Sequence, residues 1–202
     1  MVRRTKAEAQ ATRSTLLDAA ERLFETKGVS RTSLQDIATA AGVTRGAVYW
    51  HFKDKAHVFN AMMERVQLPM EEAAAHLEAC EGREPLHRLR ELLISALTRV
   101  AVDHRVQRVY EIAIHKVEYV DELVVLQQRH RQAVAEHLAT IGRCLQRAGL
   151  DPRHALGLHA LLVGLIHTWM LTPGAFDLVA DGRAAIDAQL AGLQCHDTPC
   201  AP

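Results

Sequence analysis

The sequence predicts an all-α fold of about nine helices, in which a small N-terminal three-helix domain precedes a larger helical domain. Ala, Leu and Val are abundant, aromatic residues make up only 4% of the chain, and hydrophobic residues make up 49%. This composition favours helices and supplies enough apolar surface for a sizeable core. Apolar residues recur at i, i+3, i+4 and i+7 in successive segments, which is the spacing of one helix face.

The first helix is expected over residues 8–27. Gly28 follows it directly, at the position where helix C-termini prefer glycine. Thr32 and Gln35 then match a capping box, in which a hydroxyl and a polar side chain three residues later satisfy the free N–H groups of a helix start. We therefore expect the second helix to begin at Thr32.

Residues 33–52 predict a helix-turn-helix. The second helix ends at Gly42, and Thr44 is a good N-cap for a short third helix. Two helices joined by a short turn that contains glycine describe this motif. The first turn of the third helix is polar or small, and Gly46 within it costs up to about 1 kcal/mol relative to Ala. We therefore expect this end to approach another surface closely. Further along, we expect Val48 and Phe52 to face inward, Tyr49 and His51 to face outward, and Trp50 to pack at the edge of the small domain.

Further helices follow, separated by breaks at Gly and Pro. Asp54 is expected to cap the next helix, and Pro69 to break or kink it. The helices expected after it cover residues 70–80, 86–102, 105–116, 122–147, 153–171 and 182–193, and a frayed tail follows.

The net charge of zero hides an asymmetry along the chain. Residues 1–65 carry 11 Lys and Arg against 7 Asp and Glu, whereas residues 66–202 carry 13 against 17. The basic N-terminal third is typical of a segment that binds a polyanion. We find no apolar run that looks long enough to span a bilayer and no signal peptide, so we expect a cytoplasmic protein without a membrane partner. The four cysteines lack CxxC spacing and are expected to be reduced.

The third helix has the character of a DNA recognition helix, which enters the major groove with its N-terminal residues at the base edges. Arg45 is the best candidate for reading a base, because Arg can hydrogen-bond guanine through two donors. Gly46 lets the backbone approach, and Ala47 can touch a thymine methyl group. Taken singly, each is also compatible with an ordinary surface residue. The candidates for phosphate contacts are Thr32, Ser33, Thr44, Tyr49, His51 and Lys55.

The N-terminal third resembles the signature of the TetR family of transcriptional regulators through the run TSLQDIATAAGVTRGAVYWHFKDK. The AcrR and TtgR branch, whose members repress multidrug efflux pump operons, is similar through VRRTKAEAQATR, YWHFKDK, EIAIHKVE and LVGLIHTW. The resemblance implies a DNA-binding domain over residues 1–55, an effector-binding and dimerisation domain over 56–194, and a flexible tail over 195–202. Position by position, it implies that the DNA-facing residues are Thr44, Arg45, Gly46, Tyr49, Trp50, His51 and Lys55.

Small residues on one face of the expected helix 153–171 suggest a dimer interface. Gly157, Gly164 and Leu171 recur at seven-residue spacing, and Ala160 adds a small neighbour. Small residues on one face allow two helices to pack closely. Packing within one subunit is the alternative. The resemblance favours the interface, because in this family the last two helices build a four-helix bundle between subunits.

Polar residues within apolar helix patterns are candidates for effector binding. His159, Val163 and His167 share one helix face. The alternative for each histidine is an ordinary core or surface residue that does not contact the effector. Relatives of the branch carry polar ligand contacts where this chain has Ile114 and Val163, so the resemblance favours a hydrophobic or aromatic effector. The remaining candidates are Leu92, Ala96, Tyr110, Ile114, His137 and Ile141, of which Leu92 and Ala96 rest on the resemblance alone.

These expectations combine into a ligand-responsive repressor that binds a palindromic operator in double-stranded DNA as a homodimer. A small hydrophobic or aromatic effector would release it from an efflux pump operon, with the helix that starts at Asp54 as the link between the domains. No cofactor or metal is expected. The alternative is a metal-responsive regulator of the same fold, for which His115 with Glu111 and Glu118 is the nearest to a ligand cluster. The chain lacks the GxSxG, phosphate-loop and dinucleotide motifs of common enzymes.

Overall fold

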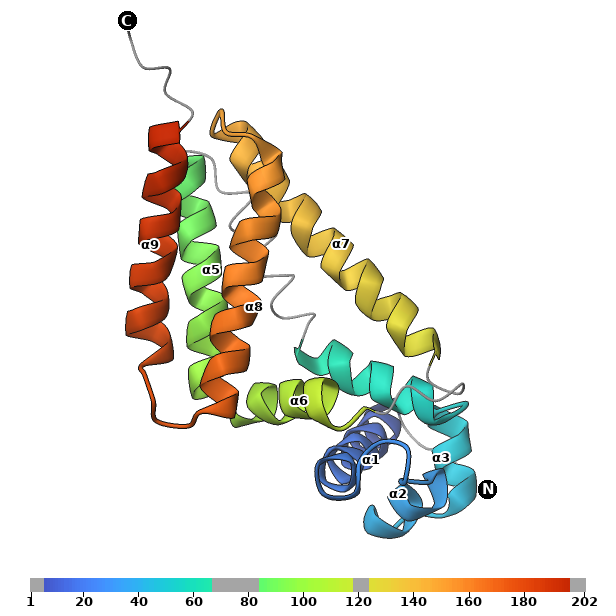
Figure 1. Cartoon of the computed structure of the whole chain (residues 1–202). Coiled ribbons are helices and arrows are strands. Elements are labelled where there is room, and N and C mark those ends of the chain that lie inside the picture. The colour runs from blue at the N-terminus through green and yellow to red at the C-terminus, as the bar shows by residue number, and fades with distance from the viewer. Residues whose placement is uncertain (1–5, 67–83, 118–123, 197–202) are drawn as a thin grey trace, which may run out of the picture. The chain divides into compact units, whose positions relative to one another are not determined.

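The computed structural model describes residues 6–66, 84–117 and 124–196, and every regular element in these ranges is a helix (Figure 1). The all-α prediction is confirmed. Expected segments outside these ranges, such as the helix over 70–80 and the kink at Pro69, are not described. The helices are α1 (Lys6–Lys27), α2 (Leu34–Ala40), α3 (Arg45–His51), a helix over residues 55–66, α5 (Pro85–Val102), α6 (His104–His115), α7 (Val124–Arg147), the short 3-10 helix η2 (Pro152–His154), α8 (Ala155–Leu171) and α9 (Leu178–His196).

The chain divides into two compact units. The first comprises residues 1–68 and 108–129, so it contains α1 to α3, the helix 55–66 and most of α6. The second comprises residues 69–107 and 130–202, so it contains α5, most of α7, η2, α8 and α9. The N-terminal three helices and the larger C-terminal part therefore do not separate at a single point in the chain.

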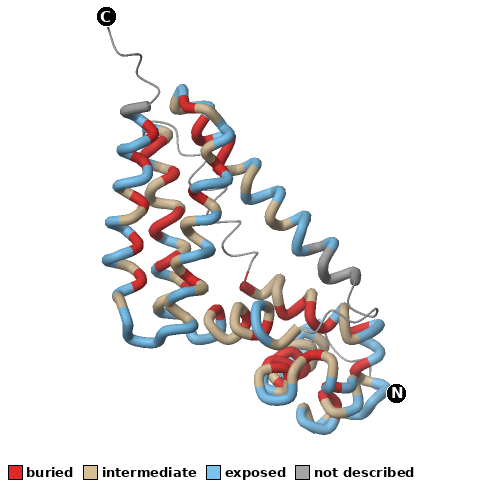
Figure 2. The backbone as a smooth tube through the Cα atoms, viewed as in Figure 1, coloured by how far each residue is buried: buried red, intermediate tan, exposed pale blue. Residues whose placement is uncertain are grey.

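The core of the first unit forms where α1 packs against the short helices that follow it. Phe24 of α1 is fully buried, and its ring lies 6.4 Å from that of Phe59. Val48 and Phe52 are also buried, which confirms their predicted inward orientation. Figure 2 shows buried positions along α1 and exposed positions on the outer side of α2 and α3. The outer side of this small helical unit is therefore left free for other contacts.

The connection after α1 follows the predicted glycine stop and ties α1 to α6. Gly28 has φ of +84°, a conformation that L side chains rarely adopt, and its N–H donates to the Phe24 carbonyl at 3.0 Å. The next N–H, of Val29, donates to the carbonyl of Lys116 at 3.1 Å. Arg108 of α6 also lies 3.0 Å from a carboxylate oxygen of Glu25. The C-terminal part of α6 is thus attached to the same unit as the helix-turn-helix.

In the second unit, α5 packs against α9, and an ion pair joins the two helices. Arg90 Nε lies 2.6 Å from Asp187 Oδ1, with a second hydrogen bond of 2.9 Å from Nη2 to Oδ2. Gly182 of α9 is buried, and a Cβ built there would overlap Leu97 Cδ1. This close contact explains a wrong prediction. Gly182 marked the expected start of the last helix, but α9 begins at Leu178 and holds this glycine in its interior.

The helix α8 corrects the expectation that no apolar run is long enough to span a bilayer. The stretch Pro152–Leu171 is 20 residues long and apolar enough, by length and composition, to cross a membrane. Only 17% of its most apolar window is buried inside the structure. The helix therefore leaves most of an apolar surface uncovered within one chain.

Candidate nucleic-acid interface and regulatory residues

The N-terminus of α2 is fixed by a capping box one residue later than predicted. Ser33 is the N-cap, and its Oγ accepts a hydrogen bond from the N–H of Asp36 at 3.1 Å. The Asp36 carboxylate in turn accepts from the Ser33 N–H at 2.9 Å and from its hydroxyl at 2.6 Å. The hydrogen bond from the Ser33 hydroxyl, and after it the one from the Ser33 backbone N–H, lowers the pKa of Asp36, because both bonds favour the ionised carboxylate. Ser33 is exposed at the helix start, where a phosphate can approach.

Thr32 must be removed from the predicted phosphate contacts and from the capping box. Its side chain is buried, and its hydroxyl donates to the Gly28 carbonyl at 2.8 Å. The hydroxyl therefore closes the turn after α1 and is not presented to solvent. Ser33 caps α2 because the hydroxyl of Thr32 is already bonded to the Gly28 carbonyl.

The N-terminus of α3 has the predicted open geometry. Thr44 is the N-cap, and its Oγ1 accepts from the Ala47 N–H at 3.3 Å. Thr44, Arg45 and Gly46 are exposed, and Ala47 is half-buried. A Cβ added at Gly46 would meet only the Thr44 Oγ1, at 4.0 Å. Packing against the described residues therefore does not require a glycine at this position.

Arg45 and Tyr49 lie one turn apart and contact each other. The Arg45 Nη2 donates to the Tyr49 hydroxyl at 3.3 Å, and the guanidinium carbon lies 5.4 Å from the centre of the ring. The hydrogen bond raises the pKa of Arg45, so the side chain stays charged. Both residues are exposed. The stacked pair holds a cation at the surface of α3, and most of its N–H donors remain available to an acceptor.

Trp50 is exposed, which the helical pattern alone did not predict. Its side chain is 72% exposed and makes an edge contact with the half-buried His51, at 4.5 Å between ring centres. The expectation that Trp50 packs at the edge of the domain is wrong. An indole left in solvent on α3 is unusual for a folded domain and fits a surface that another molecule covers.

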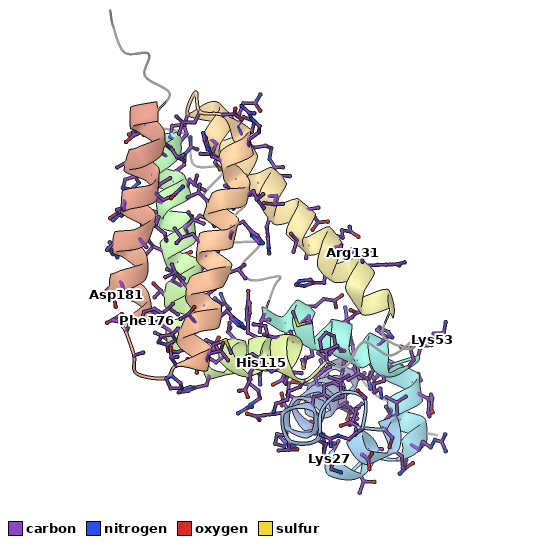
Figure 3. All side chains as sticks on the ribbon, in the orientation of Figure 1. Lys27, Lys53, His115, Arg131, Phe176 and Asp181 are labelled. Atoms are coloured by element: carbon purple, nitrogen blue, oxygen red, sulfur yellow. The ribbon has the colours of Figure 1, made fainter. Side chains whose placement is uncertain are left out.

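Two lysines follow α3. The predicted contact Lys55 is half-buried, and its ammonium donates to the Ser30 carbonyl at 2.8 Å. Two of its three donors remain for another acceptor. Lys53 is exposed in the turn between α3 and the helix 55–66, and Figure 3 shows its side chain extending away from the ribbon. Sequence reasoning missed Lys53, although the run KDK offered the signal.

The helix 55–66 is anchored to α1 through a cluster that the sequence pattern did not reveal. Arg65 Nη1 lies 2.8 Å from Asp18 Oδ1 and 2.8 Å from Glu21 Oε1, and Nη2 donates to Ser14 Oγ at 2.8 Å. The Glu21 side chain is only 1% exposed. The Asp54 carboxylate caps the start of this helix through the His57 N–H at 2.7 Å, as expected. Both ends of the helix are therefore held within the first unit.

The predicted effector residues fall in both units. Tyr110 and Ile114 belong to the first unit, where burial raises the pKa of the Tyr110 phenol and Ile114 is 39% exposed. In the second unit, the structure brings His137 and His159 together, with 6.2 Å between ring centres. Of the other candidates in the second unit, Leu92, Ala96 and His167 are half-buried, Ile141 is buried and Val163 is exposed.

The predicted dimer residues lie on one exposed face of α8. Gly157, Ala160, Gly164 and Leu171 are all exposed, and Leu156, directly before Gly157 in sequence, is 64% exposed. A Cβ at Gly164 would meet nothing within 4 Å. Packing against the described residues therefore does not account for the glycine at position 164, whereas a Cβ at Gly157 would contact Gln189 Nε2 at 3.8 Å.

The metal-responsive alternative finds no support in the described ranges, where no group of three or more His, Cys, Asp or Glu could hold a metal ion. His115 is exposed at the end of α6 (Figure 3), and Glu118 of the suggested cluster lies outside the described residues.

Comparison with known proteins agrees with this geometry. Residues 16–62 match the family described as bacterial regulatory proteins, tetR family, and residues 84–195 match the C-terminal region of MAATS-type transcriptional repressors. The HTH-type transcriptional regulator TtgR of Pseudomonas putida is 39% identical over 199 residues, which cover 94% of this chain and 95% of that one. AcrR of Shigella flexneri is 40% identical over 192 residues, covering 91% and 89%.

Solved structures agree as well. NalD, the secondary repressor of the MexAB-OprM multidrug efflux pump in Pseudomonas aeruginosa, superposes with a TM-score of 0.83 at 36% identity and covers 93% of this chain and 98% of that one. SmeT, the repressor of the Stenotrophomonas maltophilia pump SmeDEF, has been solved as a complex with triclosan, and that structure gives a TM-score of 0.82 at 37% identity with 91% of each chain covered.

The fold and the exposed recognition helix define a helix-turn-helix transcriptional regulator. The chain belongs to the tetR family of bacterial regulatory proteins.

Proposed function

We propose that this chain represses an efflux pump operon by binding a palindromic operator as a homodimer, and that a small hydrophobic or aromatic compound releases it. The observation that carries the proposal is the surface of α3, where a capped N-terminus, an open Gly46 and a charged Arg45 leave room for a major groove. The named efflux pump repressors NalD and SmeT, similar over more than nine-tenths of this chain, give the class of target genes.

The proposed base contacts come from Arg45 and Ala47, with Gly46 allowing close approach. Arg45 reads guanine, because a guanidinium can donate to two acceptors on the major-groove edge of that base. The proposed phosphate contacts are Ser33, Thr44, Tyr49, Trp50, His51 and Lys55, joined by Lys53. The DNA-binding part is proposed to end near residue 55, and residues 56–194 to serve effector binding and dimerisation, with 195–202 as a tail.

The proposed homodimer uses the exposed faces of α8 and α9. On α8 the face contains Gly157, Ala160, Gly164 and Leu171, together with the exposed Leu156. On α9 the exposed positions include Ala180, Ala184, Ala188 and Ala191, which recur at helical spacing. Two such faces can pack closely, and their contact would cover the apolar surface that a single chain leaves in water. A symmetric pair would also match the two half-sites of a palindrome.

The dimer is tested by a single charged substitution on the α8 face. Gly164→Glu should dissociate the dimer, because it places an unpaired carboxylate in an apolar contact. Arg131→Glu, which introduces the same residue at an exposed position of α7, serves as the control. Sedimentation equilibrium should find the Gly164 variant monomeric and the Arg131 variant dimeric. A dimeric Gly164→Glu protein would remove α8 from the interface.

The effector is proposed to bind in the second unit, at the helix faces that carry Leu92, Ala96, His137, Ile141, His159, Val163 and His167. The observation behind this assignment is the close approach of His137 and His159 between α7 and α8. The assignment of Tyr110 and Ile114 to the same function stays a prediction. Binding would favour a state whose two recognition helices are wrongly spaced for successive major grooves. The helix 55–66, which Arg65 holds to α1, would transmit the movement caused by effector binding to the helix-turn-helix.

The proposal treats the chain as a cytoplasmic regulator without enzymatic activity, as its membership of a family of transcriptional regulators suggests. A mobility-shift assay with DNA from upstream of the gene and of a neighbouring efflux operon tests it. The full chain should bind such DNA with a Kd that weakens steeply as salt rises, since each phosphate contact releases a counterion. Lys55→Ala should weaken binding to all sequences and reduce this salt dependence. Equal affinity for all DNA sequences at every salt concentration would contradict binding to a specific operator.

A further inference from the structure

Three histidines gather where α7 and α8 meet in the second unit. His130 and His137 are seven residues apart on α7, so they lie on the same side of that helix. The ring of His137 is 6.2 Å from that of His159 on α8, with 40° between the ring planes. His130 is close enough to act on His159 electrostatically. His159 is half-buried, whereas the two histidines of α7 are exposed. The three imidazoles form a cluster, named here the imidazole cluster.

No carboxylate among the described residues offsets this concentration of imidazoles at His159. The helix that bears it, α8, has no Asp, Glu, Lys or Arg over its whole length. The groups that act on His159 from the neighbouring elements are His137 and His130, and no acidic residue of α5, α7 or α9 is among them. On α5 and α9, Arg90 and Asp187 neutralise each other. Among the described residues, the groups that act on His159 are thus imidazoles, which can donate hydrogen bonds to an anion.

The surroundings of the imidazole cluster are apolar. Ile141, one turn after His137 on the same side of α7, is buried. On α8, Leu158 and Ile166 are buried on either side of His159 in sequence. The helices that carry His137 and His159 thus also carry apolar residues near them in sequence. The chemistry that fits such a place is an acidic head group attached to an apolar body.

We propose that the effector of this regulator is an amphipathic organic anion, an aromatic or aliphatic carboxylate, whose head group binds His159 and His137. This inference rests on the proposed function, because it names the class of compound that the effector site selects. Imidazolium N–H groups would donate charge-assisted hydrogen bonds to the carboxylate oxygens. Where the imidazoles are protonated, their positive charge would repel lipophilic cations, so the site discriminates by the sign of the ligand's charge.

Binding of the anion is coupled to proton uptake. In the free protein, burial and then the neighbouring His137 and His130 lower the pKa of His159, so the imidazole is largely neutral near pH 7. A bound carboxylate adds the missing negative charge and raises that pKa. A group whose pKa is raised in the complex strengthens binding at low pH, and this contribution is lost as pH rises through the raised pKa. Affinity for the anion should therefore be highest below the lowered pKa of the free imidazole and fall as pH rises through the raised pKa of the complex.

A matched set of three compounds tests the charge selectivity. Naphthalene-2-carboxylate, naphthalene-2-carboxamide and 2-naphthylmethylammonium share one apolar body and differ in charge. Calorimetry on the full-length protein near pH 6 should find the carboxylate bound at least about tenfold more tightly than the amide, and the ammonium compound most weakly. Near pH 8.5 the preference for the carboxylate should shrink. Heats measured in two buffers of different ionisation enthalpy should reveal uptake of up to one proton per carboxylate bound.

Two glutamine substitutions locate the effect. His159→Gln keeps a donor but cannot become charged, so it should reduce the preference for the carboxylate and its pH dependence while leaving affinity for the amide unchanged. His87→Gln, at an exposed position of α5, should change neither. A loss of affinity for all three compounds would mean that His159 acts only in packing, and would overturn the assignment. Equal binding of the three compounds by the unmodified protein, or none by any, would overturn the anionic class.

The proposed function fails by a different result. If an amide or an ammonium compound binds and releases the operator, ligand-responsive repression stands and only the anionic class is wrong. If the chain does not bind operator DNA at all, or no bound compound changes operator affinity, then repression by release is itself refuted.

Discussion

Arg65→Met tests the account of how the helix 55–66 is fixed to the DNA-binding helices. The guanidinium hydrogen-bonds both Asp18 and Glu21 at 2.8 Å, and the Glu21 side chain is 1% exposed while that of Asp18 is 37% exposed. Asp18 can regain water when the arginine is removed, so its ion pair contributes little. Glu21 cannot, and loss of the cation from a buried pair costs about 3–5 kcal/mol. We expect that decrease in the free energy of unfolding.

The assay is urea denaturation followed by circular dichroism at neutral pH, with Arg22→Met as the matched control. Arg22 is exposed on the same helix as Glu21, so its substitution should change stability by less than about 0.5 kcal/mol. The double variant Arg65→Met with Glu21→Gln should be about 1–3 kcal/mol more stable than Arg65→Met alone, because the buried charge is gone. If Arg65→Met matched the Arg22 control, the buried ion pair would not be the anchor.

Three further predictions follow from single contacts. Arg45→Ala should lose about 1–3 kcal/mol of discrimination between the operator and a sequence altered in the guanine it reads, and an unchanged sequence preference in a competition binding assay would refute the base contact. Gly182→Ala should destabilise the fold by about 1–3 kcal/mol in thermal unfolding because the added methyl group overlaps Leu97, whereas a neutral effect would show that α5 can shift to accommodate it. The Arg153 side chain lowers the pKa of Asp151 to about 2. This carboxylate therefore stabilises the fold above its unfolded-state pKa and loses that effect as pH falls toward about 2. An NMR titration should find a pKa of about 2 for Asp151, and a higher pKa in the Arg153→Gln variant.

The helix-turn-helix could be predicted from sequence because its signals are local. Gly28 stops α1 with a positive φ, and Thr44 caps α3 through the Ala47 N–H. Each signal depends on residues three or four apart, which sequence displays directly. The same local reasoning misplaced one cap, because Thr32 and Ser33 both carry hydroxyls. Which of them caps α2 is decided by the hydrogen bond from Thr32 to Gly28.

Contacts between distant segments were beyond the reach of these patterns. Gly182 looks like a helix boundary in sequence, and only the packing of Leu97 against it explains a glycine inside α9. Arg65 and Glu21 are 44 residues apart, so neither spacing nor composition could pair them. Trp50 was expected to pack at the edge of the small domain, yet it is 72% exposed on α3. In these places tertiary contacts or an external partner decide the structure.

We propose above all that an effector bound in the second unit lowers the affinity of α3 for DNA. This proposal is tested most directly by fluorescence anisotropy with a labelled operator fragment and the full-length chain, with and without a saturating compound already shown by calorimetry to bind. The account predicts that the compound raises the operator Kd by about 5–150-fold, the range of typical coupling between two sites. The same operator Kd with and without the bound compound would contradict it.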